Sequence, residues 1–353
     1  MAGAFIWYNS SLNATQKNSE NVTVIIENGA GINGIAKKLK QENLIKNEFA
    51  FKIYCKLSNR TQLQAGKYEL NKNMSVQQIV SVIEKGNIVD ESVTITFIEG
   101  KNMRWIAKTI SENTKNTEND VYNLLKDENY LDSLIDKYWF LSDDIKNKNI
   151  YYSLEGYLYP DTYTFENEDV DVKTIFETML DVMSSQLDTY KSEIQNSKYS
   201  VHELLSLASV VELEALNEED RSAVAGVFYN RLKNNMALQS DVTTYYAVKV
   251  DMGERDLTNS DLNTKNPYNT RASNMTGKLP VGPICSVSVS SIKAVIEPES
   301  SKYLFFVADK NGKVYFSKTN SEHEELINKL KSEGLWFTYW KWILGWKRNR
   351  LII

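Results

Sequence analysis

Two carboxylates at the end of residues 204–215 are the groups in this 353-residue sequence best suited to acid–base chemistry. At 100° per residue, the apolar residues of this stretch form one stripe, which is typical of a helix packed on a core. Glu212 follows Ala208 by four residues and lies on the stripe, whereas Glu214 lies near its edge. A buried carboxyl group either pairs with a cation or takes up a proton. A carboxyl group that is protonated near neutral pH is what a general acid requires.

The residues alone leave two interpretations of Glu212 open. In the first, it is a structural carboxylate that pairs with Arg221 or Arg231, because ion pairs in a core also perturb acids. In the second, it is a catalytic acid. Glu214 is interpreted either as an electrostatic support for Glu212 or as a surface acid, and Arg231 as a buried ion-pair partner. The helix singles out Glu212 without naming its role.

Composition excludes most other catalytic chemistries. The net charge of −5 argues against a nucleic-acid partner. The two cysteines, Cys55 and Cys285, are expected to be buried thiols. His202 and His323 are too few for a metal cluster or a Ser-His-Asp triad. The sequence also lacks a glycine-rich phosphate loop. We therefore expect neither a metal nor an organic cofactor, and carboxylate chemistry remains.

The N-terminus carries a short apolar run, residues 2–8, followed by a polar stretch to Glu20. A membrane-spanning helix needs about 20 apolar residues, far more than this run supplies. The run also lacks the basic segment and cleavage site of a signal peptide. We interpret residues 1–20 either as the remnant of a membrane anchor with its tether or as a frayed terminus.

A strand–turn–helix pattern occurs twice, 71 residues apart. Its members are Val22–Ile26, Gly29 and Ile35–Leu39, then Val93–Phe97, Gly100 and Ile106–Lys108. Between them, residues 63–70 suggest a hairpin arm, and Ser75 caps a helix that ends at Gly86. We expect an α+β protein, with a small βα module at 21–92 followed by a larger mixed α/β domain at 93–331. The alternative is that the repeat reflects two ordinary βα units.

Residues 103–149 are typical of helices with a charged surface. The next stretch, 154–165, is rich in tyrosine, is stiffened by Pro160 and is expected to be loop-like. Saccharide clefts use aromatic faces against pyranose rings, with amides and carboxylates for the hydroxyl groups. The alternative for this stretch is a core strand that enters a turn, and the residues alone favour that alternative.

Ordered sequence blocks along the chain resemble the endolytic murein transglycosylases, the YceG-like (MltG) family. The blocks are Leu154–Tyr163, Leu207–Glu212, Val227–Leu232, Leu238–Thr243, Pro267–Thr270, Leu279–Ile284, Ser291–Ala294, Tyr303–Ala308 and Phe316–Thr319 with Glu322–His323. The match covers about residues 22–331 and includes Ala65–Tyr68, which resembles the LysM-like module of that family. So many blocks in one order make chance similarity an inadequate explanation.

The resemblance implies cleavage of peptidoglycan glycan strands between N-acetylmuramic acid and N-acetylglucosamine without water. A single glutamate of the family acts twice, and the match places it at Glu212. It protonates the glycosidic oxygen and then, as a carboxylate, takes the proton from the muramic C6 hydroxyl, which closes a 1,6-anhydro ring. Such an acid requires an apolar or acid-rich pocket.

The resemblance also implies a set of residues that line the substrate cleft. These are Glu155, Tyr157, Asn230, Gln239, Asp241, Tyr268, Asn269 and Thr270. Gln239, Asp241 and Asn269 are alternatively hydrogen-bonded turn or cap residues. The chain departs from the family pattern at 285–289 and in extra residues at 271–278, both beside the expected cleft.

The tail at 332–353 is unlike the family. It holds four of the seven tryptophans, Trp336, Trp340, Trp342 and Trp346, and a basic end. It suggests a short interfacial helix with a basic rim, or alternatively an unstructured extension.

The resemblance further implies a place for the protein in the cell. We expect a single-pass membrane protein with an extracytoplasmic catalytic domain, which acts on nascent glycan strands beside wall synthases of the penicillin-binding class. Two other classes of function stay open. One is a wall-binding scaffold without activity. The other is a hydrolase with Glu212 as acid and Asp241 as base, which needs a carboxyl separation of roughly 6.5–9.5 Å.

Overall fold

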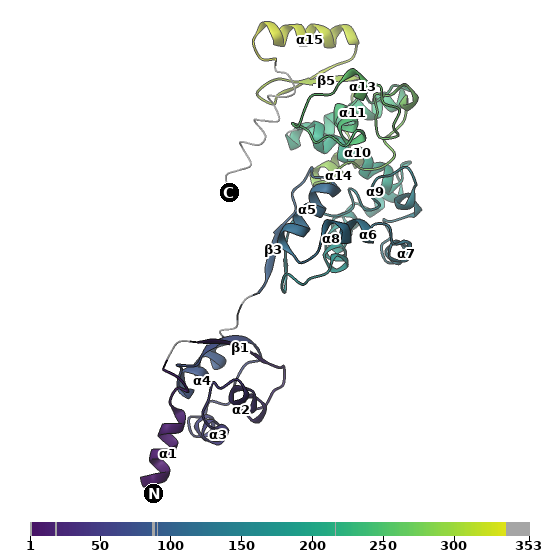
Figure 1. Cartoon of the computed structure of the whole chain (residues 1–353). Helices are drawn as coiled ribbons and strands as arrows, with labels where there is room; N and C mark the ends of the chain where they lie inside the picture. Colours follow the sequence, from purple (N-terminus) through teal and green to yellow (C-terminus); the bar gives the residue numbers. More distant parts are fainter. Residues whose placement is uncertain (1, 18–19, 87–88, 90, 216, 337–353) are drawn as a thin grey trace. The chain divides into compact units, whose positions relative to one another are not determined.

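The structure is a computed structural model that describes residues 2–17, 20–86, 89, 91–215 and 217–336. Its chain divides into two compact units, Met1–Glu91 and Ser92–Ile353 (Figure 1). Of the tail predicted at 332–353, residues 337–353 lie outside the described residues. Trp336 is described, and its backbone N–H donates to the Leu330 carbonyl at 2.9 Å.

The first unit packs helices on a two-stranded sheet. Its elements are α1 (Ala2–Leu12), β1 (Asn21–Ile26), α2 (Ile32–Gln41), α3 (Glu48–Leu57), β2 (Gly66–Asn71) and α4 (Val76–Lys85). β1 and β2 are antiparallel, with a register that runs from Asn21 opposite Asn71 to Ile26 opposite Gly66. β1 and β2 thus pair although α2 and α3 lie between them in the sequence. β2 is therefore not the arm of a local hairpin.

Local sequence signals set the helix ends in this unit. Ser75 forms the predicted cap of α4, since its side chain accepts from Gln78 N and the Gln78 side chain accepts from Ser75 N. Gly86 ends the helix in the left-handed region at φ 67°, a conformation that glycine adopts without a steric penalty. Both predictions for this helix are confirmed.

The apolar N-terminal run is helical. α1 contains it and exposes Phe5, Ile6 and Trp7, with 45% or more of each residue accessible. Among the described residues, no helix combines the length and the apolar content needed to cross a membrane.

The second unit is mainly helical, with two small sheets. Its first half contains β3 (Val93–Thr96), α5 (Met103–Asn113), α6 (Glu118–Leu124), α7 (Glu128–Lys137), η1 (Asp143–Lys146), β4 (Thr162–Phe165), α8 (Val172–Asp188) and α9 (Lys191–Gln195). Its second half contains α10 (Val201–Glu214), α11 (Glu218–Lys233), α12 (Asp241–Ala247), α13 (Asn259–Leu262), η2 (Ser273–Met275), α14 (Val289–Ile296), β5 (Phe305–Ala308), β6 (Val314–Ser317) and α15 (Asn320–Ser332). The pairs β3–β4 and β5–β6 are antiparallel. The predicted α+β class is confirmed.

The predicted strand–turn–helix repeat is present in both units. β1 leads into α2 through Gly29, and β3 leads into α5 through Gly100. Gly29 and Gly100 have φ angles of 79° and 72°, which explains why both turns use glycine. Helices also occupy residues 103–149 as predicted, and the aromatic stretch 154–165 is a turn that leads into β4.

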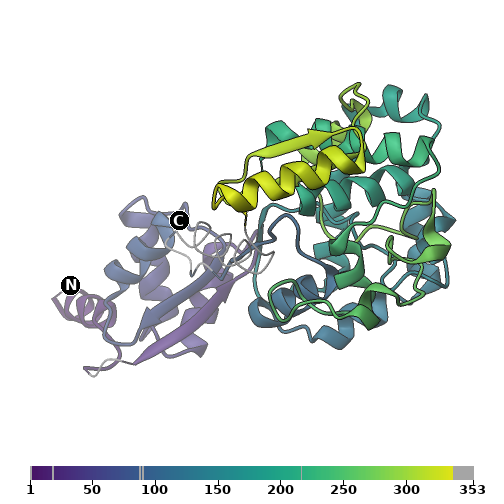
Figure 2. The same cartoon turned by 90° about the horizontal axis from the view of Figure 1, so that it is seen from above.

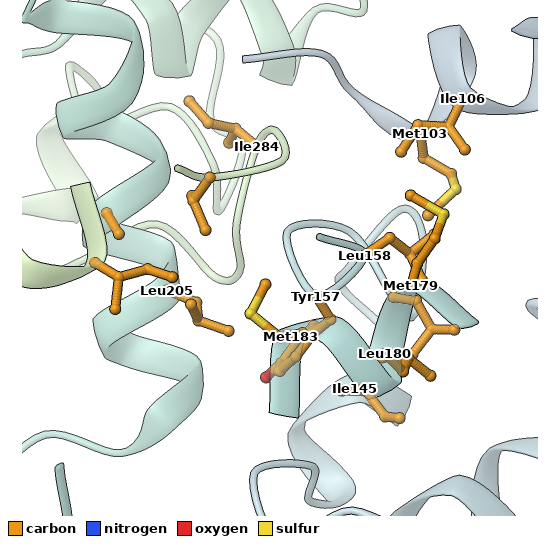
Figure 3. Close-up of a cluster of buried hydrophobic side chains, with 14 of the residues drawn as sticks. Met103, Ile106, Ile145, Tyr157, Leu158, Met179, Leu180, Met183, Leu205 and Ile284 are labelled. Atoms are coloured by element: carbon orange, nitrogen blue, oxygen red, sulfur yellow. The ribbon is translucent and has the colours of Figure 1, made fainter. Parts of the chain in front are cut away.

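One continuous core holds the larger unit together (Figure 3). It is built from side chains far apart in sequence, including Met103, Tyr157, Met183, Leu205 and Ile284. At one end of the unit, β5, β6 and α15 form a small layer, seen in yellow in Figure 2. Phe306 of β5 packs edge-on against Phe228 of α11, with ring centroids 5.8 Å apart. This layer brings residues near the C-terminus toward the helices that carry the candidate site.

Candidate active site

Helix α10 carries both candidate carboxylates at its C-terminal end. The helix begins at a capping box in which the Ser200 and Glu203 side chains each accept from the other's backbone N–H. Its apolar residues between Leu204 and Val211 are buried in the core, which fixes the helix and its last turn. Glu212 and Glu214, only two residues apart, lie about 200° apart around the helix and therefore face different surroundings.

Glu212 forms a buried ion pair with Arg221. Its Oε1 accepts from Arg221 Nη2 at 2.9 Å, and the two side chains are only 4% and 6% exposed. Its Oε2 accepts from the backbone N–H of Ser288 at 3.0 Å and from Ser288 Oγ at 2.6 Å. The interpretation of Glu212 as a core carboxylate paired with Arg221 is confirmed. The expectation of an apolar or acid-rich pocket around Glu212 is wrong, since charge-assisted donors surround the carboxylate.

The same contacts tie Glu212 to the start of α14. Ser288 is the N-cap of that helix, and its Oγ also accepts from Ser291 N at 3.3 Å. Ser288 belongs to the segment 285–289 that departs from the family pattern. Its neighbour Cys285 is a buried free thiol, as predicted.

Glu214 instead lines two adjoining cavities, of about 320 and 700 Å³. The residues common to both cavities are Glu214, Asp241, Arg271, Phe306 and His323. Glu212 lines neither of them. Cavities of this size, with convergent polar groups on partly apolar walls, are typical of ligand sites.

The surroundings of Glu214 favour a protonated carboxyl group. Burial raises its pKa to about 7, the hydrogen bond from Ser240 opposes this shift, and the charge of Asp241 adds to it. Ser240 Oγ donates to Glu214 Oε1 at 2.6 Å. Arg271 and Arg231 lower the pKa, but more weakly. An acid that titrates near neutral pH can both give and take a proton at working pH.

Two arginines flank this carboxyl group. Arg271, from the extra loop at 271–278, forms an ion pair with Asp241. Arg231 Nε donates to the Leu304 carbonyl at 2.6 Å, and its Nη1 donates to Gln239 Oε1 at 3.2 Å. Nη1 also donates to the carbonyls of Ala237 and Leu238 at 3.1 and 3.0 Å. Arg231 thus donates to oxygen atoms of carbonyl groups, and within the described residues these contacts take the place of the predicted ion pair.

His323 is a cavity residue that the sequence reasoning did not select. It lies on α15 and stacks on Phe305, with ring centroids 5.3 Å apart. Burial lowers its pKa, and the charge of Arg231 lowers it further. Its Nδ1 has no hydrogen-bond partner within the described part of the chain. The sequence pointed to His323 only through its place in the last block that resembles the family. Its separation of 109 residues from Glu214 gives no indication that the two side chains share a cavity.

Two predicted cleft residues, Gln239 and Asp241, line the cavity beside Glu214. Two others, Glu155 and Tyr157, lie in the core with 1% exposure each. Glu155 Oε1 accepts from Met103 N at 2.9 Å, at the start of α5, and its Oε2 accepts from Tyr246 Oη at 2.8 Å. Glu155 therefore stabilises a helix N-terminus.

Tyr157 bonds to a histidine of α10. Its hydroxyl lies 2.9 Å from His202 Nδ1, and His202 Nε2 lies 2.9 Å from the Val281 carbonyl. A carbonyl only accepts, so Nε2 donates and Nδ1 accepts from Tyr157. The hydrogen bonds of His202 to Tyr157 and Val281 hold α10 in place on its core-facing side.

The remaining four predicted cleft residues hold loops in place. Asn230 Nδ2 donates to the Tyr303 carbonyl at 2.9 Å, and Tyr268 Oη accepts from Tyr151 N at 3.2 Å. Asn269 Oδ1 accepts from Thr244 Oγ1 at 2.7 Å, and Thr270 Oγ1 accepts from Ser240 N at 3.1 Å. Thr270 thereby positions Ser240, the partner of Glu214.

Across the described residues, no group of three or more histidine, cysteine, aspartate or glutamate side chains is arranged to hold a metal ion.

The buried Glu155 predicts a pH-dependent stability. Burial raises its pKa to about 7, above the value of an unfolded glutamate. Between those two values the folded chain keeps a proton that the unfolded chain releases, so stability falls as pH rises and levels off above pH 7. We expect Glu155→Gln to flatten this slope by up to about 1.4 kcal/mol per pH unit. Thermal unfolding of both proteins between pH 5 and pH 8 measures it, and parallel pH profiles would contradict the assignment.

Comparisons with known proteins agree with one another. The model of the YceG-like family matches residues 24–329. An endolytic murein transglycosylase of Bacillus subtilis is 38% identical over 331 residues, which are 93% of this chain and 90% of the relative. One of Streptococcus pneumoniae serotype 2 is 33% identical over 345 residues, which are 92% of this chain and 62% of that longer relative. The crystal structure of a YceG-like protein from Listeria monocytogenes aligns with a TM-score of 0.62 at 38% identity, covering 88% of this chain and all of that one. The chain therefore belongs to the YceG-like family.

Proposed function

We propose that this protein is an endolytic murein transglycosylase, a lyase that cuts peptidoglycan glycan strands. The relatives of the same name, similar over nine tenths of this chain, support the reaction class. The observation that carries the proposal is Glu214, a carboxyl group with a pKa near 7 on the wall of a large cavity. One such group is sufficient for a reaction in which the same residue first donates and then accepts a proton.

The proposed reaction uses Glu214 twice. Its carboxyl proton passes to the oxygen between N-acetylmuramic acid and N-acetylglucosamine while the bond from C1 to that oxygen breaks. The C6 hydroxyl of the muramic residue then attacks C1, and its proton passes to the Glu214 carboxylate. The product is a 1,6-anhydro end, Glu214 regains its proton, and no water is consumed.

Geometry favours Glu214 over Glu212 for this role, which revises the assignment made from the resemblance. A general acid must reach its substrate and hold a proton. Glu212 satisfies its oxygens with Arg221 and Ser288 and is 4% exposed. We assign Glu212 to the ion pair that fixes the end of α10, two residues before the acid.

The neighbours of Glu214 have proposed roles in the same cavity. Ser240 holds Oε1, which leaves Oε2 as the oxygen that meets the substrate. Arg271 and Arg231 stabilise the carboxylate after proton donation. Neutral His323 and the Gln239 amide are available for hydrogen bonds to sugar hydroxyl or acetamido groups.

The proposed acid sets the pH dependence of the reaction. Protonated Glu214 is the active form at the first step, and its pKa is about 7. We expect kcat/KM to stay level on the acid side and to fall about tenfold per pH unit above pH 7. Initial rates on purified glycan strands from pH 5 to 9 measure this dependence of kcat/KM on pH. A fall that begins near pH 4.5 would contradict a raised pKa.

Mass spectrometry of fragments from purified glycan strands tests the function itself. New ends in 1,6-anhydromuramic acid support the lyase. Ends that carry one additional water would establish a hydrolase, for which Asp241 is then the candidate base. Binding without cleavage would establish a wall-binding scaffold.

The remaining expectations from the resemblance complete the proposal. Residues 21–92 are a LysM-like module, 93–331 the catalytic domain, and 1–20 part of a membrane anchor with its tether. The enzyme acts outside the cytoplasm, at the cell membrane, beside wall synthases of the penicillin-binding class. Fractionation of cells with antibodies to each segment, and co-purification with a synthase, test these points.

A further inference from the structure

A second large cavity lies elsewhere in the larger unit. Its volume is about 610 Å³, within the range of small-molecule sites. One wall comes from residues 119–131, which include α6 and the start of α7, and the other from 145–153, with Lys249 at the rim. Within the described chain, it shares no lining residue with either cavity around Glu214. We call it the α6 groove.

Tyrosine rings form a rigid part of the α6 groove. Tyr122 and Tyr152 stack across it, with ring centroids 5.8 Å apart and planes inclined by 26°. Tyr151 lies edge-on to Tyr152 at 6.5 Å and donates its hydroxyl proton to the Ala247 carbonyl at 2.7 Å. Lys249 Nζ lies 4.3 Å from the centre of the Tyr151 ring. Rings that are held in this way bind without a large loss of side-chain freedom.

Amide and hydroxyl groups complete the lining. Asn119, Asn123 and Asn147 lie at the groove, and all three residues are exposed. Ser153 Oγ donates to the Leu125 carbonyl at 2.9 Å and joins the two walls. Rigid aromatic rings beside side-chain amides suit a ligand with apolar ring faces and many hydroxyl and acetamido groups.

We propose that the α6 groove binds an N-acetylated oligosaccharide segment of the glycan strand outside the reacting site. The choice of this polymer rests on the proposed function. Helix α12 relates the two sites, because Asp241 at its first residue lines the Glu214 cavities and Lys249 follows its end. From Asp241 to Ala247 the helix rises about 9 Å at 1.5 Å per residue, and Lys249 follows two residues later, within the reach of a short oligosaccharide.

The charges of the α6 groove favour a saccharide over an acidic peptide. Lys146 is held by Asp132 and Asp143 at 2.6 and 2.7 Å. Lys249 lies on the Tyr151 ring, and the acidic Glu128 also lines the groove. Two of the three lysines that line the groove are thus already engaged, and the third, Lys126, is exposed, so the lining offers a carboxylate-rich ligand one open cation.

A titration that reports on the groove itself tests the proposal. The protein is labelled with 3-fluorotyrosine in the Glu214→Gln background, so that no substrate is cut, and Tyr122→Phe and Tyr152→Phe assign the two signals. Tetra-N-acetylchitotetraose is then added. We expect saturable shifts of both signals, and at least about fivefold weaker binding in Asn123→Ala, whose exposed side chain is removed without loss of the fold. Signals that do not move, or that move only with an acidic pentapeptide, would overturn the proposal.

Kinetics with a matched pair of variants provide a second readout. We expect Tyr122→Ala to raise KM for long strands about tenfold while KM for strands of a few sugars and kcat stay unchanged. Tyr122→Phe keeps the ring and is expected to behave like the wild type. Equal KM values for the two variants would refute a role of the ring in binding. Saccharide-dependent shifts, combined with a wild-type protein that cuts no glycan, would refute the proposed function and leave the groove assignment standing.

Discussion

Replacing Glu214 with glutamine is expected to lower the rate of glycan cleavage by at least about 10³-fold with the fold intact. An amide keeps the shape of the side chain and can still accept from Ser240, but it cannot donate the proton to the glycosidic oxygen. General acid catalysis alone contributes about 10²–10⁴-fold, and here the same group also serves as the base. Release of soluble fragments from purified strands measures the rate, and thermal unfolding checks the fold.

Glu212→Gln is the matched control, because it makes the same chemical change two residues away. A glutamine keeps one acceptor oxygen, for either Arg221 or Ser288, and its NH2 group faces the other donor. We therefore expect a lower stability but a loss of activity smaller than tenfold. An inactive Glu212→Gln protein with normal unfolding, next to an active Glu214→Gln protein, would reverse the two assignments. The pair therefore separates an acid that faces the cavity from one that holds the helix.

Arg221→Ala is expected to cause the largest loss of stability. It leaves the Glu212 carboxylate buried beside Ser288 without its cation. Breaking a buried ion pair from one side costs about 3–5 kcal/mol. For a unit of this size, that corresponds to a fall in the thermal midpoint of about 10 °C. Calorimetry of the full chain measures the change.

An exposed pair on α5 provides the control for Arg221→Ala. Lys108 and Glu112 are 3.7 Å apart, and their side chains are 64% and 60% exposed. Exposed pairs of this type contribute about 0.3–0.5 kcal/mol, so Lys108→Ala is expected to shift the midpoint by about 1 °C. A shift for Arg221→Ala as small as that for Lys108→Ala would show that the core tolerates the unpaired carboxylate.

Features that depend on local order along the chain could be predicted from sequence. The apolar stripe identified α10, the repeat identified β1–α2 and β3–α5, and Ser75 with Gly86 identified the ends of α4. Each follows from backbone geometry and the side-chain period of one element. Arg221 was also foreseen as one of two partners of Glu212, because a buried carboxylate on a core helix requires a nearby cation.

The composition of the cavity could not be predicted in the same way. It brings together Glu214 at the end of α10, Asp241 at the start of α12, Arg271 in a loop and His323 on α15. No periodicity relates these positions. Sequence similarity to a family also marks residues that hold the fold, such as Asn269 and Thr270, as strongly as those that meet a substrate. Only the surroundings separated Glu212 from Glu214, two acids in one motif: Arg221 and Ser288 enclose Glu212, whereas Glu214 lines the cavity.

The most direct test of the Glu214 assignment is product analysis by mass spectrometry in ¹⁸O-labelled water. Purified glycan strands are incubated with the wild type, Glu212→Gln and Glu214→Gln. We expect new 1,6-anhydromuramic ends without ¹⁸O from the wild type and from Glu212→Gln, and none from Glu214→Gln. Labelled reducing ends, or anhydro ends formed by Glu214→Gln at the wild-type rate, would contradict this expectation.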